Sequence, residues 1–249
     1  MITVKSENDL VKMRRACKVT GDTLKMIEEY IKPGVTTGEL DEIIESYIRA
    51  QGCTPNFKHL YGFPASACIS IDDVVVHGIP SDRKLVEGEI VSIDVGAAFG
   101  GLNGDAARTF AVGQISAEKQ RLIDVTRESF FEGIKQAKAG RRLGDLSYAI
   151  QSHVEKNGYS VVRAMTGHGI GRRVHEDPNV PNFGTPGQGV MLKAGYTLAV
   201  EPMVNMGDFR VIIDRGDGWT CRTADGKPSA HYENTILIRN NGEPEILTL

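Results

Sequence analysis

Hydrophobic positions with helical spacing occur in two similar stretches of the chain. Residues 32–52 and 138–158 each have apolar side chains three and four residues apart, the spacing of one face of an amphipathic helix. These positions are Leu40, Ile43, Ile44, Tyr47 and Ile48 in the first stretch and Leu146, Ile150, His153 and Val154 in the second. A longer helical pattern precedes each stretch, over residues 6–31 and 116–138, and begins at a serine that can cap a helix. The pattern predicts two pairs of helices.

The two stretches also match each other residue by residue. They align without gaps at an offset of 106 positions (138 − 32), with seven identities in twenty-one residues. This match favours an internal duplication, although two amphipathic helices after a glycine turn can converge on such a pattern. We therefore predict one α+β domain over residues 1–249, with two similar halves at roughly 1–112 and 113–249 and a functional site between them.

Strand-like apolar runs accompany the helices, and two of them enclose a glycine-rich segment. Residues 90–95 and 105–112 flank residues 100–104, whose composition is typical of a hairpin connection. The first run contains Asp94 and the second contains Asp105. Positions equidistant from a turn centre face each other across an antiparallel pair, so we expect these two side chains to be directly opposed, with Cβ atoms about 5 Å apart. Two anions this close repel each other unless a cation lies between them.

Two further apolar runs carry one glutamate each, Glu201 within residues 198–204 and Glu233 within residues 232–238. His168 stands between two glycines, which permit a tight backbone bend. Taken singly, an acid in a strand is more often salt-bridged, and a histidine between glycines is more often part of a turn. Together, two aspartates, two glutamates and a histidine form an oxygen-rich ligand set, which suits two divalent ions such as Mn, Fe, Co or Zn.

With these motifs in view, the sequence resembles the type I methionine aminopeptidases, which are metallopeptidases of the pita-bread fold. The resemblance covers nearly the whole chain and rests on five motifs in the expected order and spacing. They are His77-Gly78-Ile79-Pro80; Ile93-Asp94-Val95 with Asp105 eleven residues later; Thr166 to Gly171 followed by His175-Glu176-Asp177-Pro178; Val200-Glu201-Pro202-Met203; and Glu233-Asn234-Thr235. The resemblance implies duplicated halves related by a pseudo-twofold axis, with a curved antiparallel sheet covered by helices.

The resemblance also implies an activity and a set of residue roles. It implies hydrolysis of the N-terminal methionine from nascent proteins and peptides with a small second residue, through a hydroxide that bridges two divalent ions. The implied metal ligands are Asp94, Asp105, His168, Glu201 and Glu233, with Asp105 and Glu233 bridging both ions. Glu201 would also transfer the proton, and His175 and His77 would act beside it at the reaction centre. The implied substrate-binding residues are His77, Phe63, Cys68, His175 and Trp219, although an isolated Phe, Cys or Trp is more often part of a core.

The sequence departs from the family pattern close to the implied ligands. Gly96 and Ala106 stand where a small hydroxyl residue is common, and His231 stands where glutamine is usual. Because outer hydrogen bonds tune metal affinity, the metal preference is expected to differ from that of relatives. Leu60 and Val174 replace residues that are often aromatic, which predicts a looser substrate pocket.

Composition and charge narrow the class of protein. With 41% hydrophobic and 24% charged residues the chain is an ordinary globular protein, and its net charge of -3 gives no reason to expect nucleic-acid recognition. The start lacks a signal-peptide pattern, and no run approaches the roughly 18 apolar residues of a membrane span. We expect a cytoplasmic monomer whose partners are peptide and nascent-chain substrates, with a transient ribosome contact left open. The cysteines Cys17, Cys53, Cys68 and Cys221 show no paired spacing and are expected to be reduced.

Three alternatives remain at this point. A proline-specific peptidase or creatinase would share the fold but usually carries an extra N-terminal domain, whereas this chain begins almost directly with the catalytic half. A type II relative would have a helical insert before the Glu-Pro motif, but only 33 positions (201 − 168) separate His168 from Glu201. A non-catalytic binding protein on this fold typically loses ligands, and all five are present. We favour the enzyme.

Overall fold

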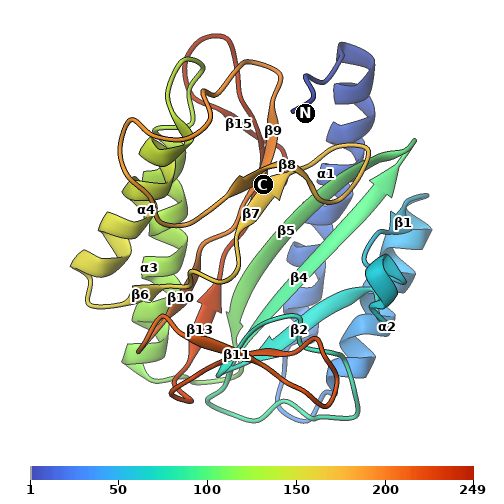
Figure 1. Cartoon of the computed structure of the whole chain (residues 1–249). Coiled ribbons are helices and arrows are strands. Elements are labelled where there is room, and N and C mark those ends of the chain that lie inside the picture. Colours follow the sequence, from blue (N-terminus) through green and yellow to red (C-terminus); the bar gives the residue numbers. More distant parts are fainter. Residues whose placement is uncertain (1) are drawn as a thin grey trace.

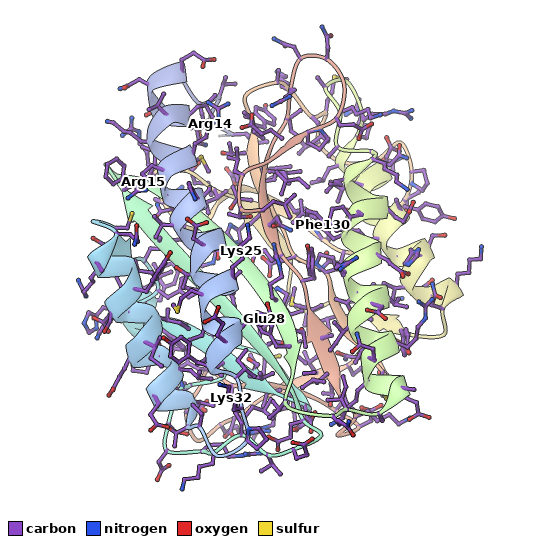
Figure 2. All side chains as sticks on the ribbon, turned by 180° about the vertical axis from the view of Figure 1, so that it is seen from behind. Arg14, Arg15, Lys25, Glu28, Lys32 and Phe130 are labelled. Atoms are coloured by element: carbon purple, nitrogen blue, oxygen red, sulfur yellow. The ribbon has the colours of Figure 1, made fainter. Side chains whose placement is uncertain are left out.

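The computed structural model describes residues 2–249, in which strands run between two pairs of helices (Figure 1). Helices α1 (Glu7–Ile27) and α2 (Thr37–Ala50) precede the long strands, and α3 (Ala117–Ile134) and α4 (Leu143–Lys156) follow them. Seen from behind, α1 and α2 lie over the left part of the strands and α3 and α4 lie along the right part, so the two pairs are side by side (Figure 2). The four predicted helices are thus confirmed. No helix among the described residues is both long and apolar enough to cross a membrane.

Serine caps begin α1 and α3, as the sequence predicted. The hydroxyl of Ser6 accepts a hydrogen bond from the backbone N–H of Asp9 at 3.2 Å, and Ser116 does the same for Lys119 at 3.2 Å. Each bond satisfies one of the N–H groups that the first turn of a helix leaves without a partner. Both helices end earlier than predicted, and α1 is continued by a short 3-10 helix, Glu28–Tyr30.

The strands form four antiparallel sheets. The first contains β4 (Ile90–Phe99), paired with β5 (Leu102–Ala111), β2 (Ala67–Ile71) and β1 (Thr54–Pro55). The second has the order β15 (Glu245–Ile246), β14 (Asn234–Leu237), β9 (Thr197–Val200), β7 (Gly167–Gly169) and β8 (Glu176–Val180). Two smaller sheets join β13 (Ser229–His231), β10 (Met203–Asn205) and β6 (Ser160–Val161), and β11 (Val211–Ile213), β12 (Cys221–Thr223) and β3 (Val74–Val76). A second short 3-10 helix spans Leu60–Gly62.

The register of β4 and β5 differs from the sequence prediction by two residues. Asp94 lies opposite Ala107, and Asp105 lies opposite Gly96, so the two aspartates are diagonal neighbours rather than a directly opposed pair. The reason is the turn: Gly100 and Gly101 alone connect the strands, both with positive φ (58° and 79°), which is the conformation of the tightest hairpin connection. The strands therefore extend further into the glycine-rich segment than predicted. A shift of two keeps both aspartates on the same face of the sheet.

The two glutamates also lie differently from the prediction, because neither is inside a strand. The run 198–204 breaks at Glu201-Pro202, between β9 and β10, and Glu233 lies in the gap between β13 and β14. A proline cannot donate to a strand ladder, which accounts for the first break. At the second break, the backbone of Glu233 forms hydrogen bonds with a strand of the other large sheet. The Glu233 N–H donates to the Ala107 carbonyl at 3.0 Å, and the Ala107 N–H donates to the Glu233 carbonyl at 3.4 Å. Glu233 is thereby tied to β5.

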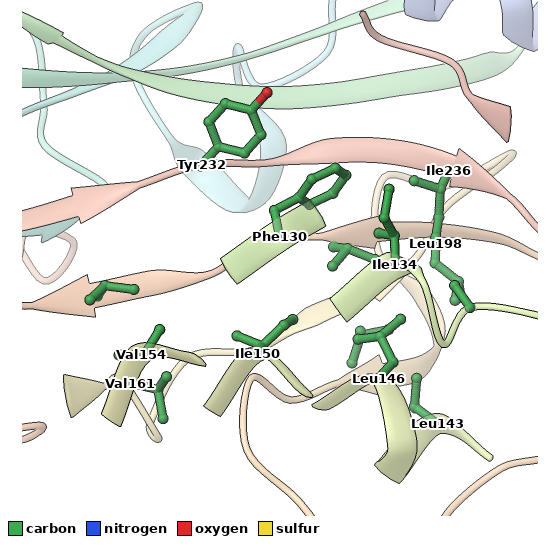
Figure 3. Close-up of a cluster of buried hydrophobic side chains, with 14 of the residues drawn as sticks. Phe130, Ile134, Leu143, Leu146, Ile150, Val154, Val161, Leu198, Tyr232 and Ile236 are labelled. Atoms are coloured by element: carbon green, nitrogen blue, oxygen red, sulfur yellow. The ribbon is translucent and has the colours of Figure 1, made fainter. Parts of the chain in front are cut away.

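Two hydrophobic clusters hold the helices to the sheets. One packs α1 and α2 against β2, β4 and β5, with residues such as Ile44, Ile48 and Ile93 fully buried. The other packs α3 and α4 against β9, β14 and their neighbours, and Figure 3 shows Phe130, Ile150 and Leu198 within it. The Phe130 ring centroid lies 5.4 Å from that of Tyr232, directly before Glu233 in the chain. Helix packing thus supports the segment that carries Glu233. The division of the chain into two duplicated halves stays a prediction.

A half-buried carboxylate on α2, that of Asp41, fixes the segment that leads into β2. Asp41 Oδ1 accepts hydrogen bonds from the backbone N–H groups of Ser66 at 3.0 Å and Ala67 at 2.8 Å, and both residues are fully buried. Without Asp41, two buried N–H groups would lack a partner, at roughly 1–3 kcal/mol each.

We expect Asp41→Ala to lower the free energy of unfolding by about 2–4 kcal/mol, because two buried amides lose their acceptor. Denaturant unfolding followed by circular dichroism measures this loss. Asp41→Asn retains a carbonyl acceptor and should lose less, and the neighbouring Glu42→Ala serves as a surface control. Equal losses in the Asp41→Ala and Glu42→Ala variants would contradict the assignment.

Candidate active site

One cavity of about 290 Å³ brings together all ten of the residues that the sequence singled out as candidates for metal binding, catalysis or substrate binding. Strand β4 supplies Asp94, β5 supplies Asp105 and β7 supplies His168, while Glu201 and Glu233 come from the two strand breaks. The other candidates on its wall are His77, His175, Phe63, Cys68 and Trp219. The lining also includes residues that we had not proposed as site residues, among them Phe57, Tyr61, Met165 and Met203.

The glycines beside His168 let neighbouring backbone approach closely. A Cβ atom on Gly169 would lie 2.0 Å from the carbonyl oxygen of Asp177, and one on Gly167 would lie 2.4 Å from that of Ala199. The glycines thus allow close approach of neighbouring backbone, but the tight bend we expected is absent, because Gly167–Gly169 form the extended strand β7 and neither glycine has a positive φ. The Nδ1 of His168 lies 2.9 Å from the Gly169 carbonyl, so Nδ1 carries the proton and Nε2 presents a lone pair to the cavity.

Three potential ligand atoms converge on one point. One atom each from Asp105, His168 and Glu233 lies within 4.8 Å of the others, and the three residues are 3%, 7% and 2% exposed. His168 Nε2 is 3.7 Å from Asp105 Oδ2 and 3.7 Å from Glu201 Oε1. These separations exceed a hydrogen bond and leave space for a cation between the atoms.

Burial dominates the electrostatics of the cluster. It raises the pKa of Asp94 to about 7 and raises the pKa values of Asp105, Glu201 and Glu233 well above their usual range. The charge of Asp94 adds to the rise at Asp105 and Glu201, because a second anion nearby disfavours ionisation. Burial also lowers the pKa of His168 to about 4, so its imidazole is neutral at pH 7.

The donor set fits divalent ions. Asp94 Oδ1 and Asp105 Oδ1 are buried with no hydrogen-bond partner among the described residues, and such oxygens are costly to bury unless a cation contacts them. Four carboxylates and a neutral imidazole are the ligands that Mn, Fe, Co and Zn accept. The residues that could hold such ions are Asp94, Asp105, His168, Glu201 and Glu233.

Another part of the cavity lining is apolar and aromatic. The rings of Phe63 and Trp219 meet edge to face with centroids 5.2 Å apart, and the His77 ring lies 6.2 Å from that of Trp219. Cys68 lies opposite Asp94 in the pairing of β2 with β4, and it links this part to the carboxylates. His77 has a φ of 61°, a left-handed conformation that non-glycine residues rarely adopt and that occurs often at functional sites.

His175 lies beside His168, and burial lowers the pKa of both rings. Their ring centroids are 4.4 Å apart, and the His175 ring also stacks on that of Tyr61, with centroids 5.7 Å apart. The Tyr61 side chain is 72% exposed, so it borders solvent at the edge of the cavity. Tyr61 has a φ of 52°, a left-handed backbone conformation. The only sequence signal for an unusual backbone at this point was the neighbouring Gly62.

The departures from the family pattern have different structural settings. A Cβ atom on Gly96 would lie 2.1 Å from Asn56 Oδ1, so a larger residue at this position would require the Asn56 side chain to move. Leu60 and Val174 pack in one cluster with Phe57 and Phe63 beside the cavity. His231 is 1% exposed, and burial lowers its pKa to about 3.

Comparison with known proteins now identifies the class. Residues 11–240 match the profile of metallopeptidase family M24, and the chain belongs to that family. A methionine aminopeptidase of Clostridium perfringens is 58% identical over 250 residues, covering 100% of this chain and 99% of that protein. Methionine aminopeptidase 1 of Bacillus subtilis is 46% identical, covering 97% of each. Within the family, the chain groups with the methionine aminopeptidases, as the sequence motifs indicated.

Solved structures agree on the fold. The crystal structure of the methionine aminopeptidase from Thermotoga maritima matches with a TM-score of 0.97 at 45% identity, covering 100% of this chain and 99% of that one. The Xaa-Pro dipeptidase from Bacillus anthracis matches with a TM-score of 0.80 at 23% identity, covering 98% of this chain and 61% of that one, which shows a shared fold alone. The pita-bread fold of helices on antiparallel sheet is thus confirmed.

We expect divalent metal binding to release protons. Because their pKa values are raised, these carboxyl groups keep their protons to higher pH than free carboxyl groups do, and each must lose its proton to become a ligand. The affinity for Co or Mn should therefore rise from pH 6 to pH 8. Calorimetric titrations at one pH in buffers of different ionisation enthalpy measure the protons released, and identical heats in all buffers would contradict the raised pKa values.

Proposed function

We propose that this metallopeptidase removes the N-terminal methionine from nascent proteins and peptides whose second residue is small, with two divalent ions in its site. The observation that carries the proposal is a single cavity with a buried carboxylate cluster and an aromatic, sulfur-containing part. The names of relatives that are 58% and 46% identical over nearly the whole chain support the same substrate.

We assign the metal site to residues from both of the larger sheets and from the two strand breaks. Asp94, Asp105, His168, Glu201 and Glu233 would hold the ions, and Asp105 and Glu233 would be shared between them. The shared pair accords with the convergence of Asp105, His168 and Glu233. When bound, such ions supply a water activated at neutral pH and polarise the scissile carbonyl.

The aromatic part suits the methionine side chain. A thioether packs favourably on aromatic edges, and Phe63, His77 and Trp219 offer three rings around the same space, with Cys68 beside them. Filling this part with methionine directs the substrate's amino end and first peptide bond toward the carboxylates. His175 and Tyr61 stack beside the cavity and would exclude a bulky second residue by steric overlap.

Glu201, His175 and His77 are the residues we assign to the reaction itself. Burial raises the Glu201 pKa, which suits a carboxylate that accepts a proton from water and returns it to the leaving amine. His175 remains neutral because burial lowers its pKa, so it can donate a hydrogen bond to the oxygen that becomes negative. His77 is assigned to the scissile amide.

The setting of the reaction is part of the proposal. Free N-terminal methionines arise where proteins are made, so we propose that the enzyme works in the cytoplasm, as a monomer, on chains emerging from the ribosome or soon after. A transient ribosome contact is included in this proposal. The net charge of -3 offers no general basis for nucleic-acid binding.

The function is tested by metal removal and restoration. The protein is stripped with chelator, given Mn, Co, Fe or Zn singly, and assayed with Met-Gly-Met-Met beside an Xaa-Pro peptide. We expect metal-dependent release of methionine from the first peptide alone. Cleavage of the Xaa-Pro peptide would place the enzyme in the proline-specific branch, and no cleavage with any metal would favour a binding protein.

Glu201→Gln tests the proton-transfer role. We expect kcat to fall by about 10²- to 10⁴-fold, because an amide cannot accept the proton. Metal content is measured in the same samples, so that lost catalysis is separated from lost ligation. Glu128→Gln, on the exposed side of α3, is the control and should keep normal turnover. Near-normal turnover of a metal-loaded Glu201→Gln enzyme would rule the role out.

A further inference from the structure

A buried histidine outside the proposed ligand set lies directly against the carboxylate cluster. His231 ends β13, where it pairs with Met203 of β10, and it is 1% exposed. Its main chain is fixed from β5: the N–H donates to the Thr109 hydroxyl at 2.9 Å, and that hydroxyl lies 2.9 Å from the His231 carbonyl. The position of the ring is therefore set by two strands.

The free nitrogen of this ring faces two of the proposed ligands. His231 Nε2 is 3.7 Å from Glu201 Oε2 and 4.0 Å from Glu233 Oε2. The same nitrogen is buried and has no hydrogen-bond partner among residues 2–249. An imidazole nitrogen buried in this way is unfavourable unless a neighbour satisfies it. The nearest polar group that can do so is the Glu201 carboxylate.

Glu201 thus lies between two imidazoles that face its two different oxygens. Oε1 is 3.7 Å from His168 Nε2, and Oε2 is 3.7 Å from His231 Nε2. His168 and Glu201 both line the cavity, whereas His231 does not. His231 therefore lies outside the cavity wall, and any effect it has on the site passes through the carboxylates of Glu201, which is the nearer, and Glu233.

We propose that His231 is a positioning residue for Glu201: its Nε2–H donates to Oε2 and so turns Oε1 toward the cavity and the metal. The inference rests on the ligand role proposed above for Glu201. A movement of roughly 0.8 Å brings the two atoms to hydrogen-bond distance, within the reach of side-chain rotation. A carboxylate held at one oxygen presents the other in a single direction, and such outer contacts change metal affinity by about 10- to 100-fold.

The test compares His231→Leu, which removes the donor, with His231→Gln, which restores an N–H donor on a side chain of similar length. His153→Gln on α4, whose ring pairs with Glu128 away from the cavity, is the matched control. Each variant is stripped and titrated with Co(II), and affinity and the visible absorption spectrum are recorded. We expect His231→Leu to bind Co(II) about 10- to 100-fold more weakly with a changed spectrum, and His231→Gln to bind within a few-fold of the parent.

Two results would overturn the proposal. One is a folded His231→Leu protein with unchanged Co(II) affinity and spectrum, and the other is a His231→Gln protein as weakened as the leucine variant. If the leucine variant does not fold, ¹⁵N NMR of the zinc-loaded parent decides: a protonated Nε2 on His231 supports the proposal, and an unprotonated one refutes it.

These readouts do not depend on hydrolysis. A parent protein that binds Co(II) but releases no methionine from Met-Gly-Met-Met contradicts the proposed function, while the Co(II) titrations still judge His231. A parent that releases methionine, with variants that bind Co(II) as it does, contradicts only the role of His231.

Discussion

Four closely spaced carboxyl groups repel one another as soon as they ionise, and this repulsion governs the site. Asp105 and Glu233 are almost wholly buried, and burial raises the pKa of every member of the cluster. Removing four anions from water is unfavourable by several kcal/mol each without a compensating partner. Three observations indicate that the site binds cations. His168 is neutral, Asp94 and Asp105 each have a buried oxygen without a hydrogen-bond partner among the described residues, and the chain belongs to a metallopeptidase family.

Much of this arrangement could be predicted from sequence. The helices were predictable because apolar residues on one face, such as Ile44 and Ile48, and capping serines are local signals. The candidate residues of the site were predictable because acids within apolar runs are unusual, and because motif order is specific. The structure brings all ten of these residues to one cavity, although their roles as ligands and catalysts remain proposals.

What could not be predicted depended on contacts distant in sequence. The register of β4 and β5 follows from a two-residue turn at Gly100-Gly101, and four nearby glycines made several turns equally plausible. The break at Glu233 has no local signal, because it arises from hydrogen bonds to Ala107, 126 residues earlier (233 − 107). The sequence marked His231 as a departure expected to alter metal preference, but only the structure shows that its ring faces Glu201.

The hydrogen bonds between Glu233 and β5 have a consequence for the metal-free protein. Together with Thr235, whose hydroxyl lies 2.8 Å from the Asp105 carbonyl and accepts from the Asp105 N–H at 3.0 Å, they fasten an aspartate strand to the glutamate segment. The chain cannot relieve the repulsion by letting these segments drift apart, because buried backbone bonds would break. The remaining relief is protonation: without metal, the raised pKa values mean that these carboxyl groups keep their protons to higher pH than free carboxyl groups do, and an incoming metal ion would have to displace them.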